Sequence, residues 1–170
     1  MEEKKKNKIF YAVIISIAAV ILVFNIFSYF GASIFLPGRE LAAVSGKDPL
    51  NNHTVSLDVS KGTVILNIWA TWCGACIAEM PEIKKIAENH KVFGVIKPSF
   101  KYEVYREVAP NFRSVIASEK FFEDLYISVL PTTLFIQDGI IKKVHTGVIS
   151  ADVVEEWITS SSQEPPLQDR

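Results

Sequence analysis

Two cysteines three residues apart are the residues best suited to chemistry in this sequence. Cys73 and Cys76 close the stretch Trp-Ala-Thr-Trp-Cys-Gly-Ala-Cys, which follows an apolar run over residues 63–70 that predicts a buried strand. A helical pattern starts at Gly74, so Cys73 is expected just beyond a helix N-terminus, where free backbone N–H groups stabilise negative charge. This position favours the thiolate, which is the nucleophilic form of cysteine. The sequence therefore predicts that Cys73 attacks a disulfide and that Cys76, one turn further on, resolves the mixed disulfide.

The residues alone allow two other roles for the cysteine pair, a structural disulfide and a zinc site. A structural disulfide between them would constrain the unfolded chain by only roughly 2 kcal/mol, because the loop that it closes is very short. A zinc site would need two histidines besides the two thiols. The histidines lie on separate segments without paired spacing, and we expect them at the surface: His53, His90 and His145. We therefore expect no metal at the pair.

The composition excludes two broad classes of protein. The 170 residues carry 18 basic and 19 acidic side chains, a formal net charge of −1, which argues against a polybasic nucleic-acid-binding protein. Hydrophobic residues make up 49% and the mean hydropathy is +0.22, too apolar for a disordered chain. The positive hydropathy also suggests that one segment lies in a membrane.

That segment is the run over residues 9–30, which contains no charged side chain. As a helix it would be roughly 33 Å long, enough to cross a hydrocarbon core of roughly 30 Å. Four lysines precede it, and the positive-inside rule places them in the cytoplasm: Lys4, Lys5, Lys6 and Lys8. We expect the rest of the chain on the extracytoplasmic side of a bacterial inner (cell) membrane, an oxidising place. The alternatives are a buried soluble helix and a cleaved signal peptide with Gly31-Ala32-Ser33 as candidate site.

The remaining chain predicts one α/β domain with a central mixed sheet flanked by helices. We expect a short edge hairpin near residues 53–57 and strands over 63–70, 92–96, 113–117, 134–137 and 140–145, the last two joined by an Asp138-Gly139 hairpin turn. We expect helices over residues 74–89, 102–108, 119–126 and 151–160. The predicted division of the chain is a cytoplasmic N-terminus over 1–8, a transmembrane helix over 9–30, a stalk over 31–46, the domain over 47–160 and a disordered tail over 161–170.

Three motifs together resemble the thioredoxin superfamily. They are the Trp-Ala-Thr-Trp-Cys-Gly-Ala-Cys stretch, Glu79-Met80-Pro81, and Val129-Leu130-Pro131-Thr132-Thr133. More narrowly, the chain resembles the membrane-anchored TlpA/ResA/CcmG-type thiol–disulfide proteins over about residues 54–158. The resemblance implies a thioredoxin-like fold behind a transmembrane helix, a cis peptide bond before Pro131, and no cofactor besides the redox-active disulfide.

The resemblance also implies roles for individual residues. Cys73 matches the attacking cysteine, Cys76 the resolving one, and Pro131 the proline that faces the disulfide. Leu130 would offer backbone groups to an extended substrate strand. Trp72 is expected at the apolar rim of the site.

Two polar residues near the pair each have two alternative roles. Glu79 matches an acidic residue near the active site of ResA-like proteins, and it is either a proton acceptor or a solvated helix position. Asn67 stands where ordinary thioredoxins carry a buried aspartate, so this chain departs from them there. Asn67 is either part of the site or a hydrogen-bonded core group.

The activity implied is that of a membrane-anchored extracytoplasmic thiol–disulfide oxidoreductase working in the reducing direction. Its expected substrates are disulfides in exported proteins, such as the haem-attachment cysteines of apocytochrome c. The expected electron source is a membrane thiol carrier of the CcdA or DsbD type, and no nucleic acid is expected as a partner. The alternatives are a dithiol oxidase and a module that binds thiols or metal without turnover.

Overall fold

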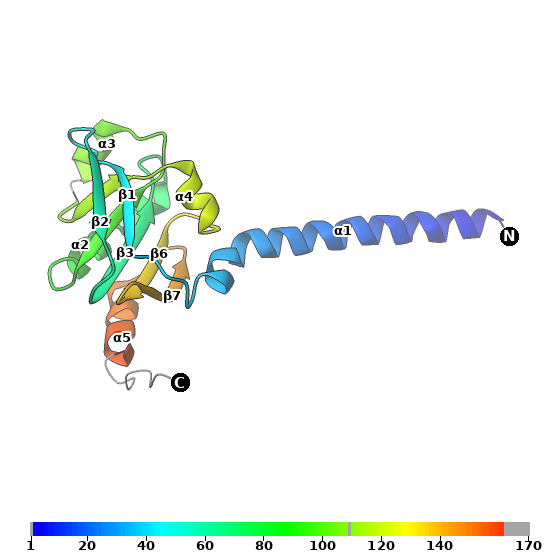
Figure 1. Ribbon diagram of the computed structural model, residues 1–170. Helices are drawn as coiled ribbons and strands as arrows, with labels where there is room; N and C mark the ends of the chain where they lie inside the picture. The colour runs from blue at the N-terminus through cyan, green and yellow to red at the C-terminus, as the bar shows by residue number, and fades with distance from the viewer. Residues whose placement is uncertain (1, 109, 162–170) are drawn as a thin grey trace.

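The computed structural model describes residues 2–108 and 110–161, which form a sheet domain with one long helix projecting from it (Figure 1). In chain order the elements are α1 (Glu2–Phe35), β1 (Ala43–Lys47), β2 (Thr54–Asp58), β3 (Thr63–Trp69), α2 (Gly74–Ile86), β4 (Val92–Ile96), α3 (Tyr102–Val108), β5 (Arg113–Ile116), α4 (Glu119–Asp124), β6 (Thr132–Gln137), β7 (Ile140–Thr146) and α5 (Ala151–Ser161).

The strands form one seven-stranded sheet in the order β2-β1-β5-β4-β3-β6-β7. β3 runs parallel to β4, and β4 runs parallel to β5. The other pairs are antiparallel. The predicted α/β fold with a central mixed sheet is therefore confirmed, and β3 lies near the middle of the sheet, where it can carry a site at its end.

The sheet is buried on both faces, which explains the uninterrupted apolar runs in β3 and β4. Ile65 and Trp69 of β3 pack on one face, under α2, α3 and α5. Leu66 and Ile68 alternate with them and pack on the other face, in a cluster that includes side chains of α4, β1 and β2. β3 is thus held from both sides, so the turn that follows it has a fixed position.

The sequence predicts the elements from β3 to α5 in the right order and type. The Asp138-Gly139 turn is confirmed, with φ values of 49° and 78° that suit a primed hairpin turn. The predicted helix over 119–126 ends earlier, at Asp124, and Tyr126 then adopts a left-handed φ of 52°. Of the predicted disordered tail, Ser161 belongs to α5 and residues 162–170 lie outside the described residues.

The predicted stalk over 31–46 is wrong for most of its length. α1 continues to Phe35 and ends where Pro37 forbids further helix. Leu36 is then fully buried in the core of the sheet domain, and Gly38 N–H donates to the Ile141 carbonyl at 2.7 Å. Residues 43–47 form β1, the partner of β2. Small and polar side chains in this segment hid the strand, because Val44 is the only β1 residue that is buried.

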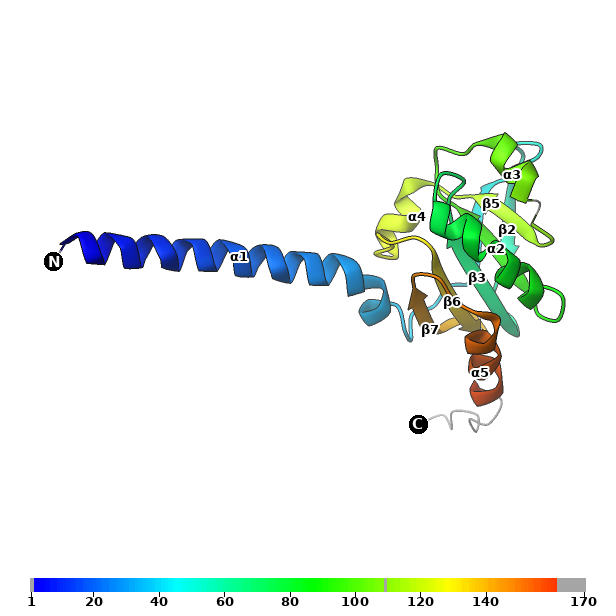
Figure 2. The same ribbon diagram turned by 180° about the vertical axis from the view of Figure 1, so that it is seen from behind.

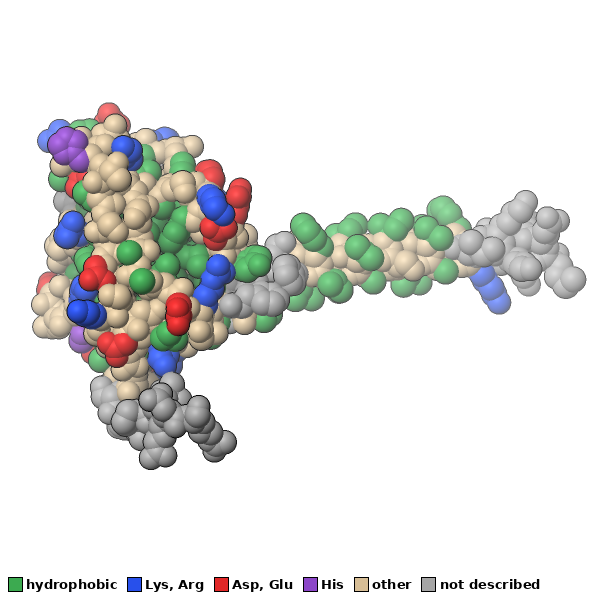
Figure 3. Space-filling model, viewed as in Figure 1, with side chains coloured by type: hydrophobic (Ala, Val, Ile, Leu, Met, Phe, Trp, Pro, Cys, Tyr) green, Lys and Arg blue, Asp and Glu red, His purple; other side chains and the backbone are tan. Residues whose placement is uncertain are grey.

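The predicted transmembrane run over 9–30 falls inside α1, which stands clear of the domain in both views (Figures 1 and 2). Apolar side chains are distributed along its described part (Figure 3). Within the part of the chain that the structure describes, no helix is both long enough and apolar enough to cross a membrane.

Candidate active site

The two cysteines lie at the turn between β3 and α2. Cys73 has an extended backbone (φ −93°, ψ 105°) and is the N-cap of α2, and its Sγ accepts a hydrogen bond from the Cys76 N–H at 3.2 Å. The two sulfur atoms are bonded to each other. Cys73 is 9% exposed and Cys76 is fully buried. The geometry therefore lets a large substrate reach the sulfur of Cys73 before that of Cys76.

The segment before β6 lies at the same end of the sheet as the cysteines. Thr132 pairs with Ile68, so Leu130 and Pro131 come level with the end of β3. The Leu130–Pro131 bond is cis, as the resemblance implies. Leu130 packs against the cluster of buried side chains that includes both cysteines. These two residues thus lie at the end of the sheet that carries the disulfide, where a substrate strand is predicted to bind.

The two tryptophans of the motif have different surroundings. Trp69 is fully buried and stacks on Tyr105 of α3, with ring centroids 6.1 Å apart. Trp72 is 50% exposed, and its indole N–H donates to the Pro98 carbonyl at 3.4 Å. Trp69 is therefore a core residue, and Trp72 presents an apolar ring to solvent beside Cys73.

Glu79 lies one turn after Cys76 on α2 and is 1% exposed, so the solvated alternative is wrong. Its Oε1 accepts from the Ile149 N–H at 2.7 Å, and its Oε2 accepts from Asn67 Nδ2 at 3.2 Å. Burial raises the pKa of Glu79 from 4.5 to about 7, and the two hydrogen bonds act in the opposite direction. A carboxyl that titrates near neutral pH therefore lies beneath the disulfide.

Asn67 links Glu79 to the sheet. It is fully buried in β3, and its Nδ2 also donates to Thr133 Oγ1 at 3.2 Å. Asn67 and Thr133 are opposite each other on β3 and β6. In the sequence, Thr133 stands out only as part of a motif, and nothing points to Ile149. A backbone donor 70 residues away from Glu79 leaves no signal in side-chain types.

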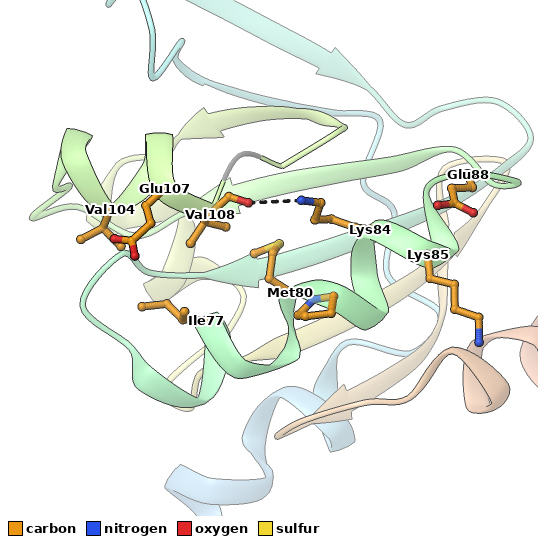
Figure 4. A pocket seen from close by; sticks show the side chains of 9 residues that line it. Ile77, Met80, Lys84, Lys85, Glu88, Val104, Glu107 and Val108 are labelled. Carbon is orange, nitrogen blue, oxygen red and sulfur yellow. Dashed lines mark hydrogen bonds between the residues drawn. The ribbon is translucent and has the colours of Figure 1, made fainter.

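An apolar groove with a volume of about 680 Å³ adjoins the site between α2 and α3 (Figure 4). Ile77, the residue after Cys76, lies at one end of it, and Met80 lies along its length. Lys84 reaches across the groove, where its Nζ donates to the Val108 carbonyl at 3.4 Å. Neither cysteine lines this groove, so it neighbours the redox centre without containing it.

The histidines that a zinc site would need lie apart from the cysteines. His90 contacts Glu155 of α5 at 2.8 Å, and His145 Nε2 lies 3.0 Å from the Val148 carbonyl. Among the described residues, no three His, Cys, Asp or Glu side chains come close enough to hold a metal ion together.

Comparison with known proteins agrees with this site. A family model described as Redoxin matches residues 37–98. The chain is 30% identical to the thiol-disulfide oxidoreductase ResA of Oceanobacillus iheyensis over 176 aligned positions, which cover 92% of this chain and 91% of that protein. It is 39% identical to the thiol:disulfide interchange protein DsbE of Allochromatium vinosum over 131 positions, covering 72% of this chain and 71% of that protein.

Solved structures support the same fold. The exposed lipoprotein thioredoxin Etrx1 of Streptococcus pneumoniae superposes with a TM-score of 0.60 at 25% identity, covering 70% of this chain and 99% of that one. StoA of Bacillus subtilis superposes with a TM-score of 0.58 at 20% identity, covering 72% and 99%. With its cysteine pair at a strand-to-helix turn and its match to ResA along nearly the whole of both sequences, the chain belongs to the ResA-like thiol–disulfide oxidoreductases of the thioredoxin superfamily.

Proposed function

We propose that this chain reduces disulfides in exported proteins, with Cys73 as the attacking residue and Cys76 as the resolving residue. The observation that carries the proposal is the pairing of the less buried sulfur with the N-terminus of α2, while the second sulfur is fully buried behind it. Backbone N–H groups at a helix start stabilise the thiolate that the first step needs.

The proposed reaction transfers two electrons in two displacements. The Cys73 thiolate attacks one sulfur of the substrate disulfide, that disulfide breaks, and the released substrate thiolate takes up a proton. Cys76 then loses its proton and attacks Cys73 Sγ, which frees the second substrate thiol and leaves the Cys73–Cys76 disulfide. Glu79 is the buried carboxyl nearest along α2 to Cys76, and we assign it as the acceptor of the Cys76 proton.

Three residues around the disulfide are proposed to bind the substrate. An extended peptide would pair with the backbone at Leu130 beside Pro131, in the manner of an added strand. The exposed ring of Trp72 would cover the apolar side of the mixed disulfide. No cofactor is needed in this scheme, because the cysteine pair itself carries the electrons.

Glu79 supports the reducing direction. An ionised carboxylate beneath the pair disfavours a second negative charge, so the reduced pair is less stabilised than in a strong oxidant. We expect a reduction potential nearer to about −270 mV, as in thioredoxin, than to about −120 mV, as in DsbA.

Turnover of insulin disulfides with dithiothreitol, compared between the native chain and Cys73→Ser, tests the activity. Equilibration of the native chain with thiol buffers of known potential tests the direction. A potential above roughly −180 mV, the value of protein disulfide isomerase, would instead identify a dithiol oxidase.

We further propose that α1 anchors the chain in a bacterial cell membrane with the domain on the extracytoplasmic side. The charge-free run over 9–30, the lysines before it and the exposed apolar side chains of α1 support this placement. A membrane thiol carrier of the CcdA or DsbD type would then re-reduce the pair. Apocytochrome c, in cytochrome c maturation, is the proposed substrate, and trapping with Cys76→Ser in intact cells would identify what is bound.

A further inference from the structure

In the buried side-chain amide of Asn67, the nitrogen forms hydrogen bonds and the oxygen forms none with the described residues. Nδ2 donates to Glu79 Oε2 and to Thr133 Oγ1, each at 3.2 Å. Oδ1 is buried and has no hydrogen-bond partner among the residues that the structure describes. Among the described residues, no hydrogen bond to Oδ1 therefore fixes the amide in this orientation.

The two charge states of Glu79 need different partners. An ionised carboxylate only accepts hydrogen bonds, whereas a carboxylic acid also donates one. The backbone N–H of Ile149 can only donate, so Glu79 Oε1 remains an acceptor in both states. Oε2 faces Asn67, whose amide holds a donor and an acceptor in nearly the same shape. A half-turn of the amide would exchange Nδ2 for Oδ1 opposite Oε2.

Thr133 is compatible with both orientations of that amide. Its hydroxyl accepts from Asn67 Nδ2 in the orientation seen, and it can donate to Oδ1 after the half-turn. Thr133 is itself fully buried, so no bulk water competes for this contact.

We propose that Asn67 is a positioning residue that holds Glu79 in place in both charge states, donating from Nδ2 to the carboxylate and, after reversal, accepting the carboxyl proton at Oδ1. Glu79 would then gain and lose a proton without moving away from the cysteine pair. This inference rests on the proposed role of Glu79 for its meaning in catalysis, but its test needs no turnover.

The charge environment suits a neutral partner at position 67. With the disulfide intact the cysteines do not titrate. The charged or titratable side chains on the helices and strands packed around Glu79 are Glu82, Lys84 and Lys85 on α2, Lys142, Lys143 and His145 on β7, and Asp152, Glu155 and Glu156 on α5. An aspartate in place of Asn67 would add a second carboxyl within hydrogen-bonding distance of Glu79, and the two would share one proton. Asparagine supplies both a donor and an acceptor without that charge.

The direct test follows both side chains by nuclear magnetic resonance. The full chain, in detergent micelles and with its disulfide intact, carries carbon-13 at the glutamate carboxyls and nitrogen-15 at the asparagine amides. Glu79→Gln and Asn67→Leu identify the two signals by their loss. Between pH 5 and pH 9 we expect the Asn67 amide signal to shift with the same midpoint as the Glu79 carboxyl signal. An Asn67 signal that stays constant while Glu79 titrates would overturn the proposal.

Variants supply the second measurement. Asn67→Leu removes both donor and acceptor. Because a hydrogen bond to the charged carboxylate is stronger than one from the neutral acid, we expect the Glu79 midpoint to rise. Asn67→Asp should give two coupled midpoints in place of one. Ser114→Ala, at a buried serine of β5 that bonds neither residue, should leave the Glu79 midpoint unchanged. A purely structural role would lower the melting temperature of the Asn67 variants without moving the midpoint, and would overturn the proposal.

The two proposals fail in different ways. If the Asn67 and Glu79 signals share a midpoint but the chain does not reduce insulin, the reductase proposal is wrong and the role of Asn67 is still supported. If the chain reduces insulin but the Asn67 signal does not change with pH, only the proposed role of Asn67 is wrong.

Discussion

Glu79 is the residue where burial and charge are most directly opposed. Its carboxyl is nearly inaccessible, yet its pKa of about 7 leaves it ionised in slightly basic solution. Ionising it in the folded state costs free energy that the unfolded chain, with a pKa near 4.5, does not bear.

The first prediction follows from that difference. The raised pKa favours folding fully below pH 4.5, and this contribution is lost as the pH rises through about 7. The loss amounts to about 3 kcal/mol in the free energy of unfolding. Urea denaturation of the oxidised chain at pH 5 and pH 8 should show most of this fall in the native protein but not in Glu79→Gln. Glu88→Gln, at an exposed position just beyond α2, should behave like the native protein. A native chain equally stable at both pH values would contradict the burial argument.

The second prediction concerns the unequal exposure of the two sulfur atoms. After reduction, iodoacetamide should modify Cys73 at least tenfold faster than Cys76, because Cys73 is at the helix start and Cys76 is buried. Mass spectrometry of the modified peptides measures both rates. Cys76→Ser should accumulate mixed disulfides through Cys73, whereas Cys73→Ser should not. Equal modification rates would reverse or remove the assigned roles.

The third prediction joins Glu79 to Cys73. Replacing the carboxylate in Glu79→Gln removes a negative charge one turn below the pair, so the thiolate fraction of Cys73 at pH 8 should rise. The rate of Cys73 alkylation at pH 8 should therefore increase several-fold, with Glu88→Gln again as the control. An unchanged rate would show that Glu79 does not act on the attacking thiol.

At the scale of the elements, the β1–β2 hairpin depends on a close approach. Lys47 and Ile116 form the only paired residues between β1 and β5 in the described sheet, and Gly46 precedes them. A Cβ atom at Gly46 would overlap the Ile116 carbonyl oxygen, which belongs to the backbone and cannot turn aside. Only glycine, which has no Cβ atom, therefore fits at position 46 without a steric clash.

The fourth prediction tests this junction. Gly46→Ala should lower the free energy of unfolding by about 1–3 kcal/mol, as overpacking does. Hydrogen exchange over residues 43–58 should quicken. Gly74→Ala is the matched control, because a Cβ there meets nothing within 4 Å. If both variants had the same stability, the close approach would not be what joins the hairpin to the sheet.

The elements differ in how far the sequence could predict them. β3 and β4 were predictable because a strand buried on both faces leaves an uninterrupted apolar run, and α3 was predicted with its observed ends. β1 was not, since it buries one side chain in five residues. The cysteine pair was evident from spacing alone. The hydrogen bonds of Glu79 were not, because one donor is a backbone N–H and the other comes from a strand 12 residues earlier.

For the whole molecule, the proposed anchor gives the fifth prediction. Membranes from cells expressing the full chain should retain it after a carbonate wash. Val20→Asp combined with Val23→Asp places two charges within the apolar part of α1 and should release the chain. Leu50→Asp combined with Val148→Asp adds the same charges at exposed positions of the sheet domain, and should not release it. Release of the native chain by the wash would remove the anchor from the proposed function.

The short segment between α1 and β1 also determines how the domain can move. Residues 38–41 lie along the edge of β7, with hydrogen bonds from Gly38 to Ile141 and from Leu41 to Gly139, each 2.7 Å long. A flexible tether would give a domain a reach that grows with the square root of the tether's length. The segment fastened along β7 gives no such reach, so the sheet domain is held next to the C-terminal end of α1. Under the proposed anchoring, Cys73 would therefore stay close to the membrane surface, and proteins that exchange electrons with it would have to reach it there.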